Sequence, residues 1–303
     1  MNDVAWIMLA GALAAGSCAI VGCFLVLRRM AMLGDAISHA VLPGIALAFL
    51  LTSSRDPLPM LAGAGALGLV TAGLTDWLHR TGRIQQDAAI GVSFTCLFAI
   101  GVILISAFAG QVDLDQECVL YGEIAYVPLD LWWLDDGRSM GPRAVWILGS
   151  VFALNVAWVA LAWKELRLCA FDPEMAAALG LPVVGMHAAL MAATSLTTVA
   201  AFESVGAILV VAMLVGPAAT AYLLTDRLVR MVGLAAVIGA MSSVFGYALA
   251  RMWDASIAGC MALAIGFFFL LAALFSPRHG VVTRAWRLRR IVGDQALEPP
   301  LIP

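Results

Sequence analysis

Charged residues are scarce in this sequence: Asp, Glu, Lys and Arg together make up 12% of its 303 residues. An ordinary soluble domain has roughly 25%. So few charges could not cover the surface of a soluble protein of this length, whereas 63% of the residues are hydrophobic. Apolar runs of about 20 residues, the length of a helix that crosses a bilayer, recur along the whole chain. Because these runs are continuous and do not alternate with a period of two, they exclude a β-barrel.

Several chemical motifs are also absent. No G-x-x-x-x-G-K-[ST] loop is present, so any ATP that drives this protein must be hydrolysed by a separate subunit. H-E-x-x-H and G-x-S-x-G motifs are missing too, which argues against a membrane enzyme. The six cysteines have no paired spacing typical of disulfides or zinc. No basic, aromatic-interleaved stretch indicates nucleic-acid binding. We therefore expect no catalytic residue and no resident cofactor.

The apolar runs predict an all-α, polytopic membrane bundle of about nine transmembrane helices. A single membrane domain, 1–277, would be followed by a basic cytoplasmic tail, 278–303. No internal repeat is evident, so the inverted-repeat design of many secondary transporters finds no support. The expected spans are 4–27, 35–52, 59–77, 88–109, 143–163, 183–202, 205–224, 231–250 and 256–276.

The distribution of basic residues predicts the orientation. With the N-terminus outside the cell, 13 of the 17 Lys and Arg residues fall in cytoplasmic segments, as the positive-inside rule requires. An odd number of spans then places the C-terminus in the cytoplasm, so we expect a multi-pass protein of the cell (inner) membrane. The one long loop, 110–142, would be external and is acidic; between Gln111 and Arg138 it carries Asp113, Asp115, Glu117, Glu123, Asp130, Asp135 and Asp136.

Two ionisable residues open the second span. Asp35 and His39 are four residues apart, so they share one face of a helix. A carboxylate with an imidazole suits Mn²⁺, Fe²⁺ or Zn²⁺, and ionisable groups within a span are functional candidates. The alternative is that Asp35 caps the helix at the interface while a neighbouring carbonyl satisfies His39. Two ligands are an incomplete set, so the others must come from water, another helix or a second subunit.

Two further residues interrupt apolar stretches. Glu203 lies at the predicted external junction of the sixth and seventh spans. It could receive a cation there, or it could cap the following helix. His187, near the inner end of the sixth span, is isolated in the sequence, and such a histidine is more often a core or interfacial residue than a ligand.

The cytoplasmic segment 164–183 predicts a short, separately capped helix. Asp172 is a good N-cap, Pro173 suits the first helical position and Glu174 the first turn. Gly180, followed by Pro182, then ends the helix. An apolar face suited to docking into a partner protein would be formed by Met175, Ala178 and Leu179. The alternative is an amphipathic helix lying on the bilayer, but the small side chains argue against a membrane anchor.

Three blocks of this sequence, GDAISHAVLPGIALAFLL, FDPEMAAALGLPV and SVGAILVVAMLVGPAATAYLLT, resemble the signatures of the manganese/zinc/iron ABC permease family. The resemblance covers essentially the whole chain, and DQECVLYGEIAYVP looks more like the manganese/iron branch. It implies a type II importer fold with two permease subunits, expected here as a homodimer, two cytoplasmic ABC ATPases and an extracytoplasmic metal-binding protein. Asp35 and His39 match the family's polar pair in the pore helix, and residues 172–181 match its coupling helix.

We therefore expect a permease that imports a divalent metal, manganese before zinc or iron, by alternating access. The metal would be the transported substrate. Two alternatives remain: an ABC permease for a metal chelate, and a self-contained secondary metal transporter or channel. A wide pore lined by aromatics would favour the first, and metal transport by the purified chain without an ATPase would favour the second.

Overall fold

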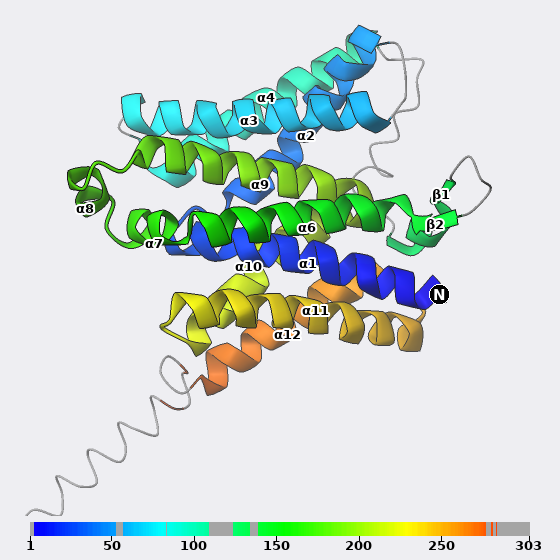
Figure 1. Cartoon of the computed structure of the whole chain (residues 1–303). Helices are drawn as coiled ribbons and strands as arrows, with labels where there is room; N and C mark the ends of the chain where they lie inside the picture. Colours follow the sequence, from blue (N-terminus) through cyan, green and yellow to red (C-terminus); the bar gives the residue numbers. More distant parts are fainter. Residues whose placement is uncertain are drawn as a thin grey trace, which may run out of the picture.

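The computed structural model describes residues 3–52, 57–82, 84–108, 124–133, 139–276, 280 and 283. Long helices lie side by side in one bundle (Figure 1). In the described part of the chain, eight helices are long and apolar enough to cross a membrane, which confirms the expected all-α membrane bundle. These helices are α1 (Asp3–Leu27), α2 (Leu33–Thr52), α4 (Gln86–Phe108), α6 (Arg143–Leu161), α9 (Val183–Val205), α10 (Ala207–Leu224), α11 (Leu228–Trp253) and α12 (Ile257–Phe275).

The ninth expected span, at 59–77, corresponds to α3 (Pro57–Gly82), which is not one of those eight. Its 26 residues extend about 39 Å, more than the roughly 30 Å hydrocarbon core of a bilayer. It packs against α2, α4 and α9. Each of the nine predicted spans therefore corresponds to one helix of the bundle.

Short elements lie at the two ends of the bundle (Figure 1). At one end α7 (Trp163–Phe171) and α8 (Pro173–Ala178) connect α6 to α9. At the other end, near the N-terminus, the 3₁₀-helix η1 (Ile124–Leu129) precedes an antiparallel hairpin of β1 (Leu131–Trp133) and β2 (Ser139–Pro142). Of the acidic residues predicted for the long loop only Asp130 is described; the others, and nearly all of the tail 278–303, lie outside the described residues.

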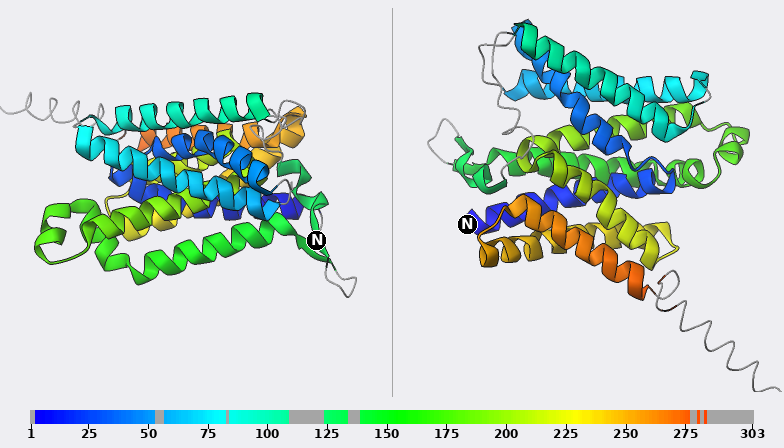
Figure 2. Two further views of the ribbon diagram at one scale, coloured as in Figure 1. Left: turned by 90° about the horizontal axis from the view of Figure 1, so that it is seen from above. Right: turned by 180° about the vertical axis from the view of Figure 1, so that it is seen from behind.

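The helices are arranged in layers around α1. In the views of Figures 1 and 2, α3 and α4 lie on one side of the bundle and α11 and α12 on the other, with α1, α6 and α9 between them. Helix α1 packs against α6, α9, α10 and α11, and nearly all its residues from Ala10 to Leu25 are buried. It is the central helix of the core.

Glycines let α1 approach its neighbours closely. A Cβ atom at Gly11 would lie 3.0 Å from the Ser243 Oγ of α11, and one at Gly16 would lie 2.9 Å from the Phe152 ring of α6. At Gly22 the added atom would collide with the backbone carbonyl oxygen of Leu214 in α10. Small residues permit such close backbone approach between membrane helices, where lipid supplies no hydrophobic drive for association.

The closest of these contacts gives a test of the packing. Gly22→Ala places a methyl group against backbone, which cannot move aside as a flexible side chain can. We expect a loss of about 1–3 kcal/mol, the usual range for overpacking, measured as a lower thermal unfolding midpoint of the purified chain. The control is Gly266→Ala in α12, where nothing lies within 4 Å of the added atom. Equal midpoints for the two variants would contradict the role assigned to Gly22.

Candidate functional site

The first two turns of α2 carry the Asp35 and His39 pair. The His39 Nε2 atom lies 3.6 Å from the Asp35 Oδ1 atom, and the two side chains are 36% and 33% exposed, respectively. The pair thus shares one helix face, as the four-residue spacing predicts. Side chains with this exposure can be reached by an ion or by a ligand from another chain.

Aromatic residues of α4 hold the imidazole in place. The His39 ring stacks on Phe94, with 5.6 Å between ring centroids and an interplanar angle of 27°. Phe98 meets the same ring edge-on at 6.0 Å. In the described parts of the chain no three His, Cys, Asp or Glu residues gather as a metal site. The pair therefore presents one nitrogen and one oxygen donor atom on one helix face, without a third candidate group in the residues described.

The structure places Glu203 elsewhere. It is exposed in the last turn of α9, and the charged groups near it are Arg143 and Asp130, beside the β1–β2 hairpin. The interpretation of Glu203 as a cap is wrong, because the N-cap residue of α10 is Gly206 and no side chain caps this helix. Gly206 has φ 81°, so the chain turns sharply after α9 has extended past Glu203. Glu203 is not brought into a group with Asp35 and His39.

His187 belongs to a polar cluster that sequence reasoning missed. Its Nε2 atom lies 3.2 Å from the Asp76 Oδ1 atom of α3. Its Nδ1 atom lies 3.0 Å from Arg28 Nη1, and Arg28 Nη2 donates to the Cys169 carbonyl oxygen of α7 at 3.2 Å. Because a guanidinium only donates, Nδ1 must accept, which leaves the ring proton on Nε2, facing Asp76. The sequence held one signal for this cluster: Asp76 is an ionisable residue at the end of an apolar span.

Arg28 is fixed by the turn that joins α1 to α2. Arg29 has φ 60°, which reverses the chain immediately after α1, and the Met30 N–H donates to the Leu25 carbonyl oxygen at 2.9 Å. The partly buried Arg28 side chain then points to α7 and α9, whereas Arg29 is exposed. Burial lowers the pKa of the Arg28 guanidinium, but an arginine stays protonated in proteins. The cluster therefore links the start of α2 to α3, α7 and α9.

The short helix α8 is built as predicted. In α8 the Met175 N–H donates to Asp172 Oδ1 at 2.9 Å, and Pro173 occupies the first turn. Gly180 has φ 78°. Its N–H donates to the Ala177 carbonyl oxygen, and the Leu181 N–H donates to the Ala176 carbonyl oxygen. These are the two hydrogen bonds of a Schellman cap. Figure 1 shows α8 projecting from one end of the bundle.

The apolar face of α8 is exposed. Met175 is 52% and Leu179 is 66% exposed, and Ala178 is also exposed. Only Ala176 is buried among the residues of this helix. The arrangement leaves Met175, Ala178 and Leu179 available to a partner, as the sequence pattern predicts.

The N-cap of α8 can be tested in the isolated chain. Loss of an Asp N-cap costs about 1 kcal/mol, so Asp172→Ala is expected to speed amide exchange in α8 about fivefold. Hydrogen exchange at short labelling times measures this. The matched control, Glu174→Gln, keeps the cap and is expected to change the rate less. Similar rates for both variants would show that the Asp172 bond does not hold the helix.

Comparisons with known proteins agree with this architecture. Residues 1–276 match a family described as the ABC 3 transport family. The chain is 51% identical over 296 residues to the manganese transport system membrane protein MntD of Bacillus subtilis, covering 98% of this chain and 100% of that relative. It is 41% identical over 283 residues to the zinc transport system membrane protein TroD of Treponema pallidum, covering 92% of this chain and 75% of that relative.

A solved structure also matches. A chain of PsaBC from Streptococcus pneumoniae, solved in complex with Fab, has a TM-score of 0.76 and 32% sequence identity to this chain. The match covers 95% of this chain and 96% of that one. The fold is thus shared over nearly the whole length of both proteins.

Proposed function

Because the chain belongs to the ABC 3 transport family, we propose that it is the permease subunit of an ATP-driven manganese importer, with Asp35 and His39 contacting the ion in transit. The family assignment makes the chain a membrane subunit of a metal transport system. The observation that carries the proposal is the Asp35–His39 pair, one carboxylate and one imidazole 3.6 Å apart on one face of a spanning helix.

The chemistry of the pair suits weak, transient contact with a divalent ion. Mixed N and O donors accept Mn²⁺, Zn²⁺ and Fe²⁺, and the higher identity to a manganese relative than to a zinc relative supports manganese. A complete ligand set would trap the ion, whereas transport requires that the bound ion can also dissociate. Further ligands would come from water or from a second, identical permease subunit, which the exposed sides of Asp35 and His39 could meet.

We propose that ATP hydrolysis is coupled through α8. In this scheme α8 docks on a cytoplasmic ATPase dimer through Met175, Ala178 and Leu179, with Asp172, Pro173, Glu174 and Gly180 holding its shape. Movement of α8 would pass to α7 and then, through the Cys169 carbonyl, to Arg28. Arg28 precedes α2 by one short turn, so the motion would reach Asp35 and His39 and support alternating access.

The proposed orientation places α8 in the cytoplasm and the N-terminus and the β1–β2 hairpin outside. A metal-binding protein would then deliver the ion at the hairpin end, where Glu203 and Asp130 lie. The basic residues near α7 and at the α10–α11 turn accord with the positive-inside rule. Glu203 is proposed as a receiving group at that outer end and not as a member of the Asp35–His39 site.

The proposed ion contacts predict loss of uptake. Asp35→Asn and His39→Ala are each expected to reduce manganese accumulation by at least roughly 10-fold, since even a group that only supports a metal ligand commonly contributes that much. Elemental analysis of cells carrying the complete transporter measures this for manganese, zinc and iron. The control is Ser38→Ala, whose hydroxyl donates to the Gly34 carbonyl within α2. Normal uptake by an Asp35→Lys variant that inserts normally would exclude this role.

The proposed coupling predicts a different phenotype for Arg28. Arg28→Gln removes hydrogen bonds from a charged group, worth about 1.5–3 kcal/mol each, and detaches α7 from α9. We expect less manganese transported per ATP hydrolysed, measured on the reconstituted complete transporter. The neighbouring Arg29→Gln is the matched control, because its side chain is exposed and outside the cluster. An unchanged ratio in Arg28→Gln would contradict coupling through this residue.

A further inference from the structure

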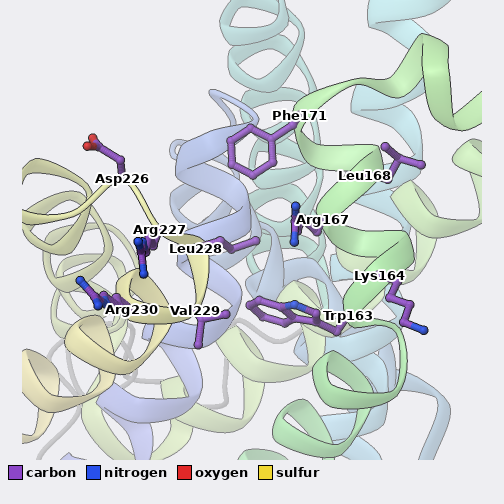
Figure 3. A pocket seen from close by; sticks show the side chains of 10 residues that line it. All are labelled: Trp163, Lys164, Arg167, Leu168, Phe171, Asp226, Arg227, Leu228, Val229 and Arg230. Carbon is purple, nitrogen blue, oxygen red and sulfur yellow. The ribbon is translucent and has the colours of Figure 1, made fainter.

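A hollow of about 930 Å³ opens at the α8 end of the bundle, between α7 and the turn that joins α10 to α11. Figure 3 shows Arg167 on one side of it and Arg227 and Arg230 on the other. Lys164 also lines the hollow, whereas Asp226 is its one acidic lining residue among those described. The lining thus has a strong excess of positive charge.

The four cations of the hollow are Lys164, Arg167, Arg227 and Arg230. In the described residues none of them forms an ion pair, and all four are exposed. Charges of one sign gathered in a concave site raise the local concentration of ligands of the opposite sign. Arginine suits phosphate in particular, because its planar guanidinium donates two parallel hydrogen bonds to phosphate oxygens. The charge of the hollow therefore points to a phosphate-bearing ligand.

The remaining lining is apolar and comes from α7 and from the start of the spanning helix α11. Trp163, Phe171 and Val229 face the hollow, and Phe171 and Val229 are 60% and 67% exposed. Leu161, the last residue of α6, is 86% exposed two residues before Trp163. Trp is enriched where a membrane protein meets the headgroup layer. Cations at the mouth, with exposed apolar side chains beside them, match a ligand with an anionic head and hydrocarbon chains.

We propose that this hollow binds the phosphate of an anionic phospholipid in the adjoining leaflet, with Arg167, Arg227 and Arg230 as its main contacts. Basic pockets between membrane helices on the cytoplasmic side bind such headgroups. The chain's own tail has the wrong charge for the site, since residues 284–303 carry four arginines against Asp294 and Glu298. This inference is independent of the transported metal and of the coupling scheme.

The test uses the full-length chain in neutral detergent. Phosphatidylglycerol is titrated in mixed micelles, and binding is followed by the rise in the thermal unfolding midpoint; phosphatidylcholine at the same mole fraction should raise it much less. In the double variant Arg227→Gln/Arg230→Gln the apparent affinity for phosphatidylglycerol should fall by roughly 30-fold, from the usual contribution of each cation at a membrane surface.

Two controls distinguish lost charge from lost folding. Arg251→Gln removes an exposed arginine from the opposite end of the same helix, α11, and should leave the affinity unchanged. Arg227→Lys/Arg230→Lys keeps both charges but loses the paired hydrogen bonds of the guanidinium, so its affinity should lie between those of the unaltered chain and the double Gln variant. A double Gln variant that binds phosphatidylglycerol as the unaltered chain does would overturn the proposal, as would equal stabilisation by phosphatidylcholine.

Two further outcomes would assign the hollow to another ligand. Inorganic phosphate or glycerol phosphate that stabilises the chain as strongly as phosphatidylglycerol, at equal concentration, would make it a site for a free anion. A double Gln variant that keeps its lipid affinity but no longer co-purifies with the ATPase would make it a protein-docking surface. Either result overturns the lipid assignment.

Discussion

Close backbone approach around α1 is the constraint on which the rest of the structure depends. Between helices in lipid there is little hydrophobic drive, so association relies on van der Waals contact and on small residues that permit it. Gly11, Gly16 and Gly22 each face a different helix: α11, α6 and α10. At each of these positions a Cβ atom would press against the neighbouring helix, so glycine permits an approach that a larger residue would prevent. The bundle is thereby organised around one buried element.

This central position fixes the chemistry at the end of α1. Arg28 directly follows the buried helix α1, and the left-handed turn at Arg29 returns the chain at once into α2. Asp35 and His39 follow within two turns. The same short stretch thus carries the candidate ion contacts and an arginine that contacts α7 and α9. A displacement of α7 can therefore be transmitted to the start of α2 through the hydrogen bond between Arg28 and the Cys169 carbonyl oxygen.

Features encoded locally could be predicted from the sequence, and features that depend on distant partners could not. The lengths of the apolar runs predicted the nine helices, and Asp172, Pro173 and Gly180 predicted where α8 begins and ends. The four-residue spacing placed Asp35 beside His39. The partners of His187 were missed because Arg28 is 159 residues away and nothing local pairs them. The interpretation of Glu203 as a cap was wrong because α9 continues past it to Val205, and the positive φ of Gly206 makes the turn instead.

Among the described residues, two Asp–His pairs lie near this end of α1, and the groups around them indicate different roles. At Asp76–His187, Arg28 already donates to the second ring nitrogen and supplies a fixed positive charge. An incoming cation would therefore be repelled, and neither ring nitrogen would offer it a lone pair. At Asp35–His39 the ring contacts Phe94 and Phe98 of α4, and both polar groups stay partly exposed. The first pair is satisfied internally and suits a structural link, whereas the second has unused ligand capacity. For this reason we assign the proposed ion contact to Asp35 and His39 and the proposed transmission of movement to the cluster beside them.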